Sequence, residues 1–133
     1  PVFNLDTGYQ FRETLKLVDQ VREKYGIEIE LRRPKLTVEQ YEMLNGGPVY
    51  THNTNKCCGD RKLAVLNDAT RGLHAWASAI RRDQSLDRGR AAIVEWDAKF
   101  HLVKISPLAN WTKKDVWGFI SKNQVPYNEL HDK

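Results

Sequence analysis

The stretch PVFNLDTGYQFRETLKLVDQVREKYGIEIELRR, residues 1–33, decides the fold class of this chain. Its apolar start, residues 1–8, closes on the letters DTG, which predicts a buried strand whose carboxyl end opens into a loop. Residues 11–25 carry apolar side chains at helical spacing, and Gly26 predicts the end of that helix. Residues 27–33 then alternate as a second strand does. This order predicts two parallel strands joined by a helix.

The rest of the chain continues the alternation of strands and helices. Helices are predicted for residues 37–44, with Thr37 and Gln40 as a capping box, for about 56–70, and for a segment capped by Asn110 or Thr112. Strands are predicted for residues 73–80, 91–97 and 100–108. We therefore predict an α/β fold with a doubly wound, mostly parallel sheet, built as a single domain over residues 1–133.

Composition limits the class of protein and the kind of partner. The chain has 133 residues, 41% of them hydrophobic, which is enough for one core without cross-links. It lacks an apolar run of about 20 residues and starts without a secretory signal pattern, so we expect a cytoplasmic protein without membrane contact, or a plastid one in a plant. The net charge of +4 favours anionic partners such as nucleotides, sulfate-like groups or nucleic acid.

The only two cysteines are adjacent, at positions 57 and 58, with two cations shortly after them. On an α-helix Cys57 would stack over Arg61 and Cys58 over Lys62, and nearby cations favour the thiolate that binds metals. The pattern suits metal ligation or redox chemistry. The alternative is that one cysteine is a small buried hydrophobe and the other an incidental neighbour. Two thiolates are also half of the four ligands that an iron–sulfur cluster usually takes.

Two loops at predicted strand ends are candidate anion sites. The loop IRRDQSLDR brings together Arg81, Arg82, Gln84, Ser85 and Arg88. Guanidinium groups bind phosphate or sulfate through paired hydrogen bonds, although aspartates in the same loop could simply neutralise them. The loop LDTG, residues 5–8, offers backbone amides to a nucleotide, or is merely a strand ending in a turn. An aspartic protease would need a β-rich fold, which the alternating elements contradict.

Four motifs together resemble one enzyme family over essentially the whole chain. These motifs are LDTG, CCGDRK, IRRDQSLDR and VKISPLANWTKKDVWGFI…VPYNELHDK. In this order and spacing they resemble the assimilatory sulfonucleotide reductases, which reduce adenylylsulfate or phosphoadenylylsulfate. The resemblance implies a fold of the adenine-nucleotide α-hydrolase (PP-loop) type and a reaction that yields sulfite and an adenine nucleotide, AMP when adenylylsulfate is the substrate.

The resemblance also implies roles for individual residues. In the branch with a double cysteine, the residues that match Cys57 and Cys58 bind a 4Fe-4S cluster and the substrate is adenylylsulfate. Lys62 matches a lysine between cluster and substrate, which implies an electrostatic catalytic role. The implied substrate-binding residues are Leu5, Asp6, Thr7, Gly8, Arg81, Arg82, Gln84, Ser85 and Arg88. The implied electron donor is thioredoxin or glutaredoxin with glutathione, acting after a carboxyl-terminal cysteine has attacked the sulfur.

The chain departs from the family pattern at several points. Ala79 stands where the family usually has glycine, and a proline common after the lysine is missing near Val65. The phosphate loop expected before Pro1, and the second cysteine pair and nucleophilic cysteine expected after Lys133, are also missing. We therefore expect a central segment of a larger reductase domain, inactive on its own and able to supply two of four cluster ligands.

Other functions remain open at this stage. Two alternatives are a phosphoadenylylsulfate reductase and a related PP-loop enzyme of sulfur transfer or nucleotide modification. A non-catalytic domain that binds nucleic acid is the third alternative, and the leading interpretation assigns no nucleic-acid partner. A homo-oligomer is compatible with the sequence.

Overall fold

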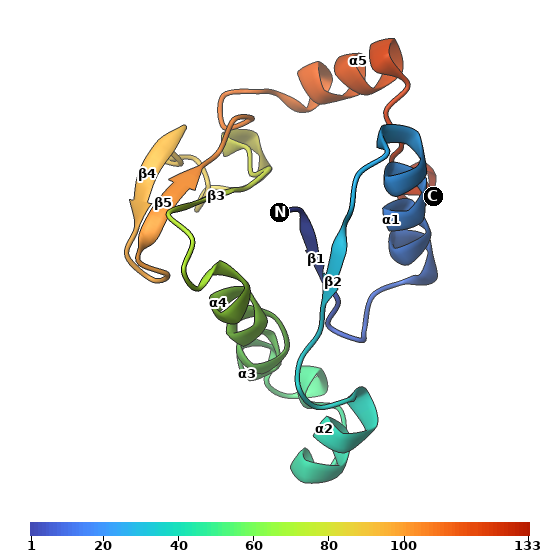
Figure 1. The fold of residues 1–133 in the computed structure, drawn as a ribbon, viewed down its shortest axis with the longest axis vertical. Helices are drawn as coiled ribbons and strands as arrows, with labels where there is room; N and C mark the ends of the chain where they lie inside the picture. Colours follow the sequence, from blue (N-terminus) through green and yellow to red (C-terminus); the bar gives the residue numbers. More distant parts are fainter. The chain divides into compact units, whose positions relative to one another are not determined.

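The structure, a computed structural model, describes residues 1–133, which divide into two compact units. Unit 1 contains Pro1–Ala69 and Pro126–Lys133, and unit 2 contains Thr70–Val125. Each unit carries its own sheet and is described by itself (Figure 1). No helix combines the length and the apolar character needed to cross a bilayer.

Unit 1 begins with the predicted strand, helix and strand. Strand β1 (Phe3–Leu5) pairs in parallel with β2 (Glu30–Arg32), and α1 (Arg12–Tyr25) connects them. Gly26 ends α1 in the left-handed region, at φ 59°, and its N–H donates to the Arg22 carbonyl. This part of the prediction is confirmed, with both strands shorter than expected.

The middle of unit 1 is helical. Its elements are α2 (Val38–Asn45), the 3₁₀ turn η1 (Val49–Thr51), α3 (Thr54–Cys58), the π-helical turn η2 (Gly59–Leu63) and α4 (Ala64–Thr70), whose last residue belongs to unit 2. The predicted capping box of α2 is confirmed: the Gln40 N–H donates to Thr37 Oγ1 at 3.2 Å, and the Thr37 N–H donates to Gln40 Oε1 at 3.0 Å. The helix predicted over about residues 56–70 is confirmed, since α3, η2 and α4 follow one another without a break, but its middle turn η2 is π-helical.

A small core joins α2, η1 and α3. Tyr41, Val49 and Cys57 are buried together, and Tyr9 packs against them. Full burial of an aliphatic side chain such as Val49, which is 1% exposed, stabilises the fold by about 1.5–3 kcal/mol. The first cysteine therefore enters the structure as part of a core.

The last eight residues of the chain return to α1. Lys16 Nζ lies 2.9 Å from Glu129 Oε1, and Asn128 Nδ2 donates to Thr14 Oγ1 at 3.0 Å. The irregular structure predicted here contains one 3₁₀ turn, η4 (Glu129–Asp132). Because both groups of this ion pair are exposed to solvent, the pair contributes little to stability.

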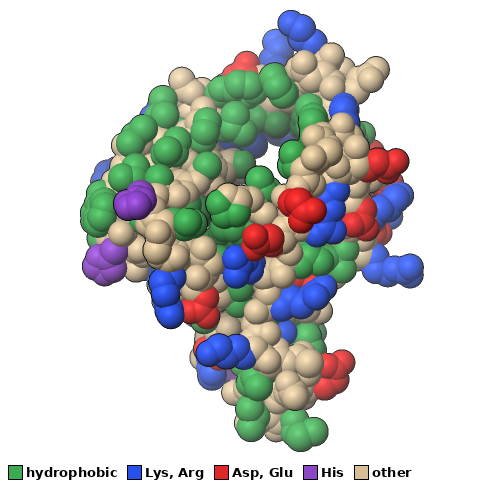
Figure 2. All heavy atoms as spheres, viewed as in Figure 1, with side chains coloured by type: hydrophobic (Ala, Val, Ile, Leu, Met, Phe, Trp, Pro, Cys, Tyr) green, Lys and Arg blue, Asp and Glu red, His purple; other side chains and the backbone are tan.

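Unit 2 holds a three-stranded sheet in the order β3-β5-β4. Strand β3 (Ala75–Ala77) is parallel to β5 (Leu102–Ile105), while β4 (Val94–Asp97) is antiparallel to β5. Helix α5 (Lys113–Asn123) follows, and Thr112, one of the two caps predicted, begins it. Alternate residues of β4, Val94 and Trp96, are each 63% exposed, and Figure 2 shows hydrophobic side chains over this region. The predicted α/β class with mostly parallel pairing is confirmed.

Candidate functional site

The loop after β1 is shaped by its own aspartate. Asp6 is 7% exposed, its Oδ1 accepts the Gly8 N–H at 3.0 Å, and its Oδ2 accepts from Arg33 Nε at 3.0 Å. The Leu5 carbonyl accepts from Gln10 Nε2 at 2.8 Å. The Gly8 amide, which we expect to be offered to a nucleotide, donates to Asp6 in this structure, and its role in nucleotide binding stays a prediction. Leu5 and Asp6 act here by fixing the loop.

Gly8 is required by both its backbone and its surroundings. Its φ is 84°, a conformation that residues with a Cβ rarely adopt. A Cβ at this position would lie 2.5 Å from Val38 Cγ2 and 3.0 Å from Arg61 Nη2. The loop end can therefore approach α2 and the π turn only because residue 8 has no side chain.

The cysteines end α3, directly before the π turn. Asn53 caps this short helix, its Oδ1 accepting the Lys56 N–H at 3.0 Å. Cys57 is 7% exposed and faces the core, whereas Cys58 is exposed. π turns are rare and occur often at functional sites, and this one follows the residues that the sequence marks as metal ligands.

Both cysteines line one cavity of about 240 Å³ in unit 1. The complete lining consists of Thr7, Tyr9, Tyr50, Thr54, Cys57, Cys58, Arg61 and Lys62. The structure thus joins three separate predictions, the strand-end loop, the thiol pair and the lysine, in one hollow. Cys57 belongs both to the core and to the wall of this cavity, so the two alternative readings of it, packing residue and ligand, are compatible.

The thiols fit a metal cluster as half of a ligand set. No group of three or more histidine, cysteine, aspartate or glutamate side chains is arranged to hold a metal ion. Cys57 and Cys58 are the only cysteines. An iron–sulfur cluster at this cavity would therefore take two ligands from here and two from residues outside this chain.

Two tyrosines beside Cys57 hold their protons unusually tightly. Burial raises the pKa of Tyr9 to about 12, and the hydrogen bond that its hydroxyl donates to Glu42 at 2.9 Å adds to this. Burial likewise raises the pKa of Tyr41 to about 12, with a further contribution from the bond to Asp60 at 2.8 Å. Both phenols are therefore neutral at physiological pH.

The Asp60 carboxylate is held in its ionised form. Its pKa is lowered, first by the hydrogen bond from Lys56 and then by the bond from Tyr41. Because Asp60 lies on η2 and Tyr41 on α2, this hydrogen bond links the π turn to α2.

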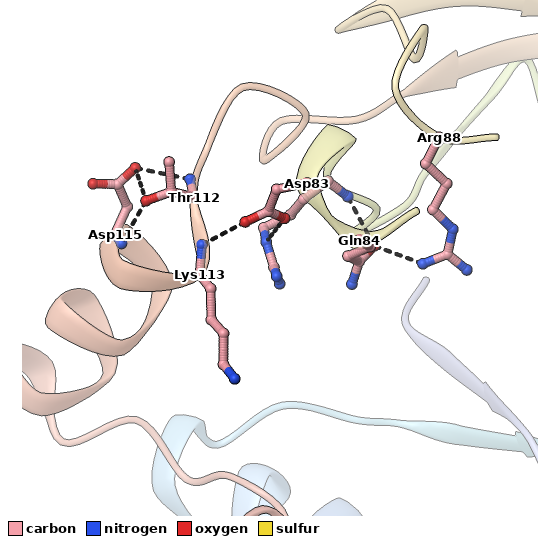
Figure 3. A network of polar contacts seen from close by, with 7 residues as sticks. Asp83, Gln84, Arg88, Thr112, Lys113 and Asp115 are labelled. Carbon is pink, nitrogen blue, oxygen red and sulfur yellow. Dashed lines mark hydrogen bonds and ion pairs between the residues drawn. The ribbon is translucent and has the colours of Figure 1, made fainter. Parts of the chain in front are cut away.

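The arginine loop of unit 2 is organised by one aspartate and one glutamine (Figure 3). Asp83 accepts from Arg81 Nε at 2.8 Å through Oδ1 and from the Lys113 N–H at 2.6 Å through Oδ2. Gln84 Oε1 accepts from Arg88 Nη1 at 2.6 Å. Asp83 thus neutralises Arg81, as the alternative reading predicts, and also fastens the loop to the start of α5.

The remaining residues of this loop are held by the backbone. Arg82 donates from Nε to the Ala91 carbonyl at 2.7 Å, and Ser85 Oγ accepts the Arg88 N–H at 3.3 Å. The five predicted residues of the loop therefore share one short segment that includes the 3₁₀ turn η3 (Arg82–Gln84). They belong to unit 2, while the cysteine cavity belongs to unit 1.

Several cavity residues were not predicted from the sequence. Tyr9 follows LDTG directly, so its place after a strand end was a usable signal. Tyr50 and Thr54 carry no comparable signal. Arg61 was read as a cation for Cys57, but it is 3% exposed and bonds to backbone carbonyls.

Comparisons with known proteins agree on one family. The sequence matches the family described as phosphoadenosine phosphosulfate reductase domain over residues 1–133. An adenosine 5'-phosphosulfate reductase of Geobacillus sp. (strain WCH70) is 44% identical over 130 residues, covering 97% of this chain and 55% of that protein. Adenosine 5'-phosphosulfate reductase 2 of Bacillus subtilis (strain 168) is 43% identical over 129 residues, covering 96% and 55%. The chain thus spans about half the length of these curated relatives.

A solved structure supports the same assignment. The crystal structure of phosphoadenylyl-sulfate (PAPS) reductase from Candida auris, a phosphate complex, matches with a TM-score of 0.83 and 27% identity. The match covers 98% of this chain and 64% of that chain. The predicted PP-loop type of fold is confirmed by this likeness.

Proposed function

The chain belongs to the phosphoadenosine phosphosulfate reductase domain family, and from this premise we propose that the full-length protein reduces adenylylsulfate to sulfite and AMP. The choice of adenylylsulfate follows the two bacterial relatives reported above, at 44% and 43% identity, both named adenosine 5'-phosphosulfate reductases. The paired cysteines support the same choice. We draw the proposal for the whole protein because the chain covers 55% of those relatives.

One observation carries the proposal: Thr7, Lys62, Cys57 and Cys58 line the same cavity of about 240 Å³. These residues come from two motifs separated by some fifty positions, and a purely structural role for each would not require them to meet. This cavity combines a strand-end loop, a lysine and two thiols. Such a combination suits an anionic nucleotide bound next to a redox group.

Cys57 and Cys58 would supply two of the four ligands of a 4Fe-4S cluster. When bound, such a cluster supplies one-electron chemistry and a local charge that depends on its oxidation state. Both cysteines lie on α3, where neighbouring side chains point about 100° apart, so only a group as large as an iron–sulfur cluster would reach both sulfurs. The exposure of Cys58 and the cavity beside Cys57 leave both sulfurs accessible to one group.

Lys62 would act electrostatically during sulfur transfer. A thiolate from outside this chain forms a bond to the sulfo sulfur, while the bond from that sulfur to the phosphate oxygen breaks and AMP leaves with the electron pair. A positive charge near that oxygen stabilises the negative charge that develops there. A second thiol, from thioredoxin or glutaredoxin with glutathione, then forms a disulfide with the enzyme sulfur and releases sulfite.

Each unit holds one loop that we propose for nucleotide binding, and each loop is considered by itself. In unit 1 this loop is residues 5–8, beside the cysteine cavity, and in unit 2 we assign Arg81, Arg82, Gln84, Ser85 and Arg88 to substrate binding. Arg88 and Gln84 are exposed, and their mutual hydrogen bond presents the guanidinium in a fixed orientation. Guanidinium groups suit sulfate and phosphate because they form paired hydrogen bonds.

The test is sulfite production by the full-length protein. Supplied with thioredoxin and adenylylsulfate, it should release sulfite and AMP in equal amounts, with a higher kcat/KM than for phosphoadenylylsulfate. Preference for the 3'-phosphorylated substrate would overturn the choice of nucleotide, and absence of sulfite from either substrate would overturn the proposed function.

A further inference from the structure

Arg61 is a buried cation bound almost entirely by the backbone. The residue is 3% exposed. Its Nε and Nη2 both donate to the Thr7 carbonyl, at 3.0 and 2.7 Å. Nη1 donates to the Leu36 carbonyl at 2.6 Å. Burial of a charge is costly unless it is well paired, so such a residue has a specific role.

The same guanidinium lies against two aromatic rings. Its central carbon is 5.2 Å from the centre of the Tyr41 ring and 5.8 Å from that of Tyr9. Because Tyr9 and Tyr41 are neutral at physiological pH, they contribute ring faces rather than counter-charges. Carbonyl dipoles and ring faces thus replace a carboxylate, and the positive charge remains uncancelled by an ion pair.

Arg61 also separates two hollows of unit 1. It lines the cysteine cavity and a second cavity of about 440 Å³, whose lining includes Arg33, Leu36 and Asp60. The side chain of Arg61 donates to the Thr7 carbonyl, in the loop proposed to bind the nucleotide. Its backbone belongs to the π turn that follows Cys57 and Cys58.

We propose that Arg61 is a positioning residue that holds the Thr7–Gly8 loop against the helix carrying the cysteine pair. This inference rests on the proposed function for its consequence, namely that nucleotide binding and the environment of the cysteines depend on each other through Arg61. The planar, forked shape of the guanidinium matters more than its charge, since its three nitrogens donate to the carbonyls of Thr7, Leu36 and Thr37.

Substitution of Arg61 by lysine separates the two effects, because lysine keeps the positive charge but lacks the planar guanidinium with its several donors. In the full-length protein, Arg61→Lys should weaken AMP binding about tenfold or more and raise amide exchange at Gly8 and Tyr9 about tenfold or more. Exchange of the Asp6 and Glu30 amides, which bond across β1 and β2, should stay as in the wild type. Arg61→Met, without charge or donors, should show the same changes. Arg12→Lys, at an exposed arginine at the start of α1, is the matched control.

A second measurement reports the cysteine side of the link. In the cluster-free protein, AMP should slow alkylation of Cys58 by iodoacetamide, and Arg61→Lys should abolish this protection at saturating AMP. Normal exchange, normal AMP affinity and normal protection in Arg61→Lys would overturn the inference. If the wild type binds no adenine nucleotide, the proposed function fails, while the exchange at Gly8 and Tyr9 still decides whether Arg61 holds the loop. Should Arg61→Met not fold, Arg61→Lys decides alone.

Discussion

Replacement of Gly8 by alanine should destabilise unit 1 far more than a glycine-to-alanine change usually does. Two costs add at this position. A left-handed backbone costs a residue with a Cβ about 1 kcal/mol. The new Cβ would also lie 2.5 Å from Val38 Cγ2 and 3.0 Å from Arg61 Nη2, and such overpacking costs about 1–3 kcal/mol. We expect a total loss of about 2–4 kcal/mol.

Gly26→Ala provides the matched control. Gly26 also has a positive φ, 59°, but a Cβ there would meet nothing within 4 Å. It should therefore lose only about 1 kcal/mol, the backbone cost. Urea denaturation of the full-length variants, followed by far-ultraviolet circular dichroism, gives both values. Equal losses in the two variants would refute the reasoning, because they would mean that the loop can move away from Val38 and Arg61 at no cost.

Three further predictions address the chemistry and the local structure. Lys62→Ala in the full-length protein should lower kcat/KM for sulfite release about a hundredfold; an unchanged rate would remove Lys62 from catalysis. Tyr9 and Tyr41 should ionise near pH 12 in a phenolate absorbance titration, and the double phenylalanine variant should lack this part of the absorbance change. Since their folded pKa lies above the ordinary value of 10.0, the stability they confer is complete below pH 10 and is lost as pH rises toward 12. Thr37→Ala should cost about 1 kcal/mol, and Thr37→Ser much less, in the same urea assay.

Local signals in the sequence were sufficient for much of the fold. Gly26 ends α1, Thr37 and Gln40 form the capping box of α2, and Thr112 begins α5, all as predicted. Each of these depends on a few neighbouring residues, so a single sequence contains the necessary information. The parallel pairing of β1 and β2 follows from the helix between them.

The contacts of the candidate site required the three-dimensional structure. The prediction that Cys57 stacks over Arg61 assumes a regular α-helix. No residue pattern predicts the π turn, which changes the spacing of side chains along the helix. The burial of Arg61 depends on carbonyls of Thr7 and Leu36, which lie far from it in the sequence. Asp83 looked like a neutralising charge, but its second bond, to the amide of Lys113, could not be seen from the sequence.

The location of the cysteine pair in one cavity leads to a direct test of the central claim, that both sulfurs bind one cluster. Iron content and visible absorbance should be measured after anaerobic reconstitution of the full-length protein and of its Cys57→Ala and Cys58→Ala variants, with circular dichroism to show that each is folded. We predict a 4Fe-4S spectrum for the wild type and loss of that cluster in each folded variant. A folded Cys57→Ala protein that retains a full cluster would contradict the account, because Cys57 would then be only a core residue.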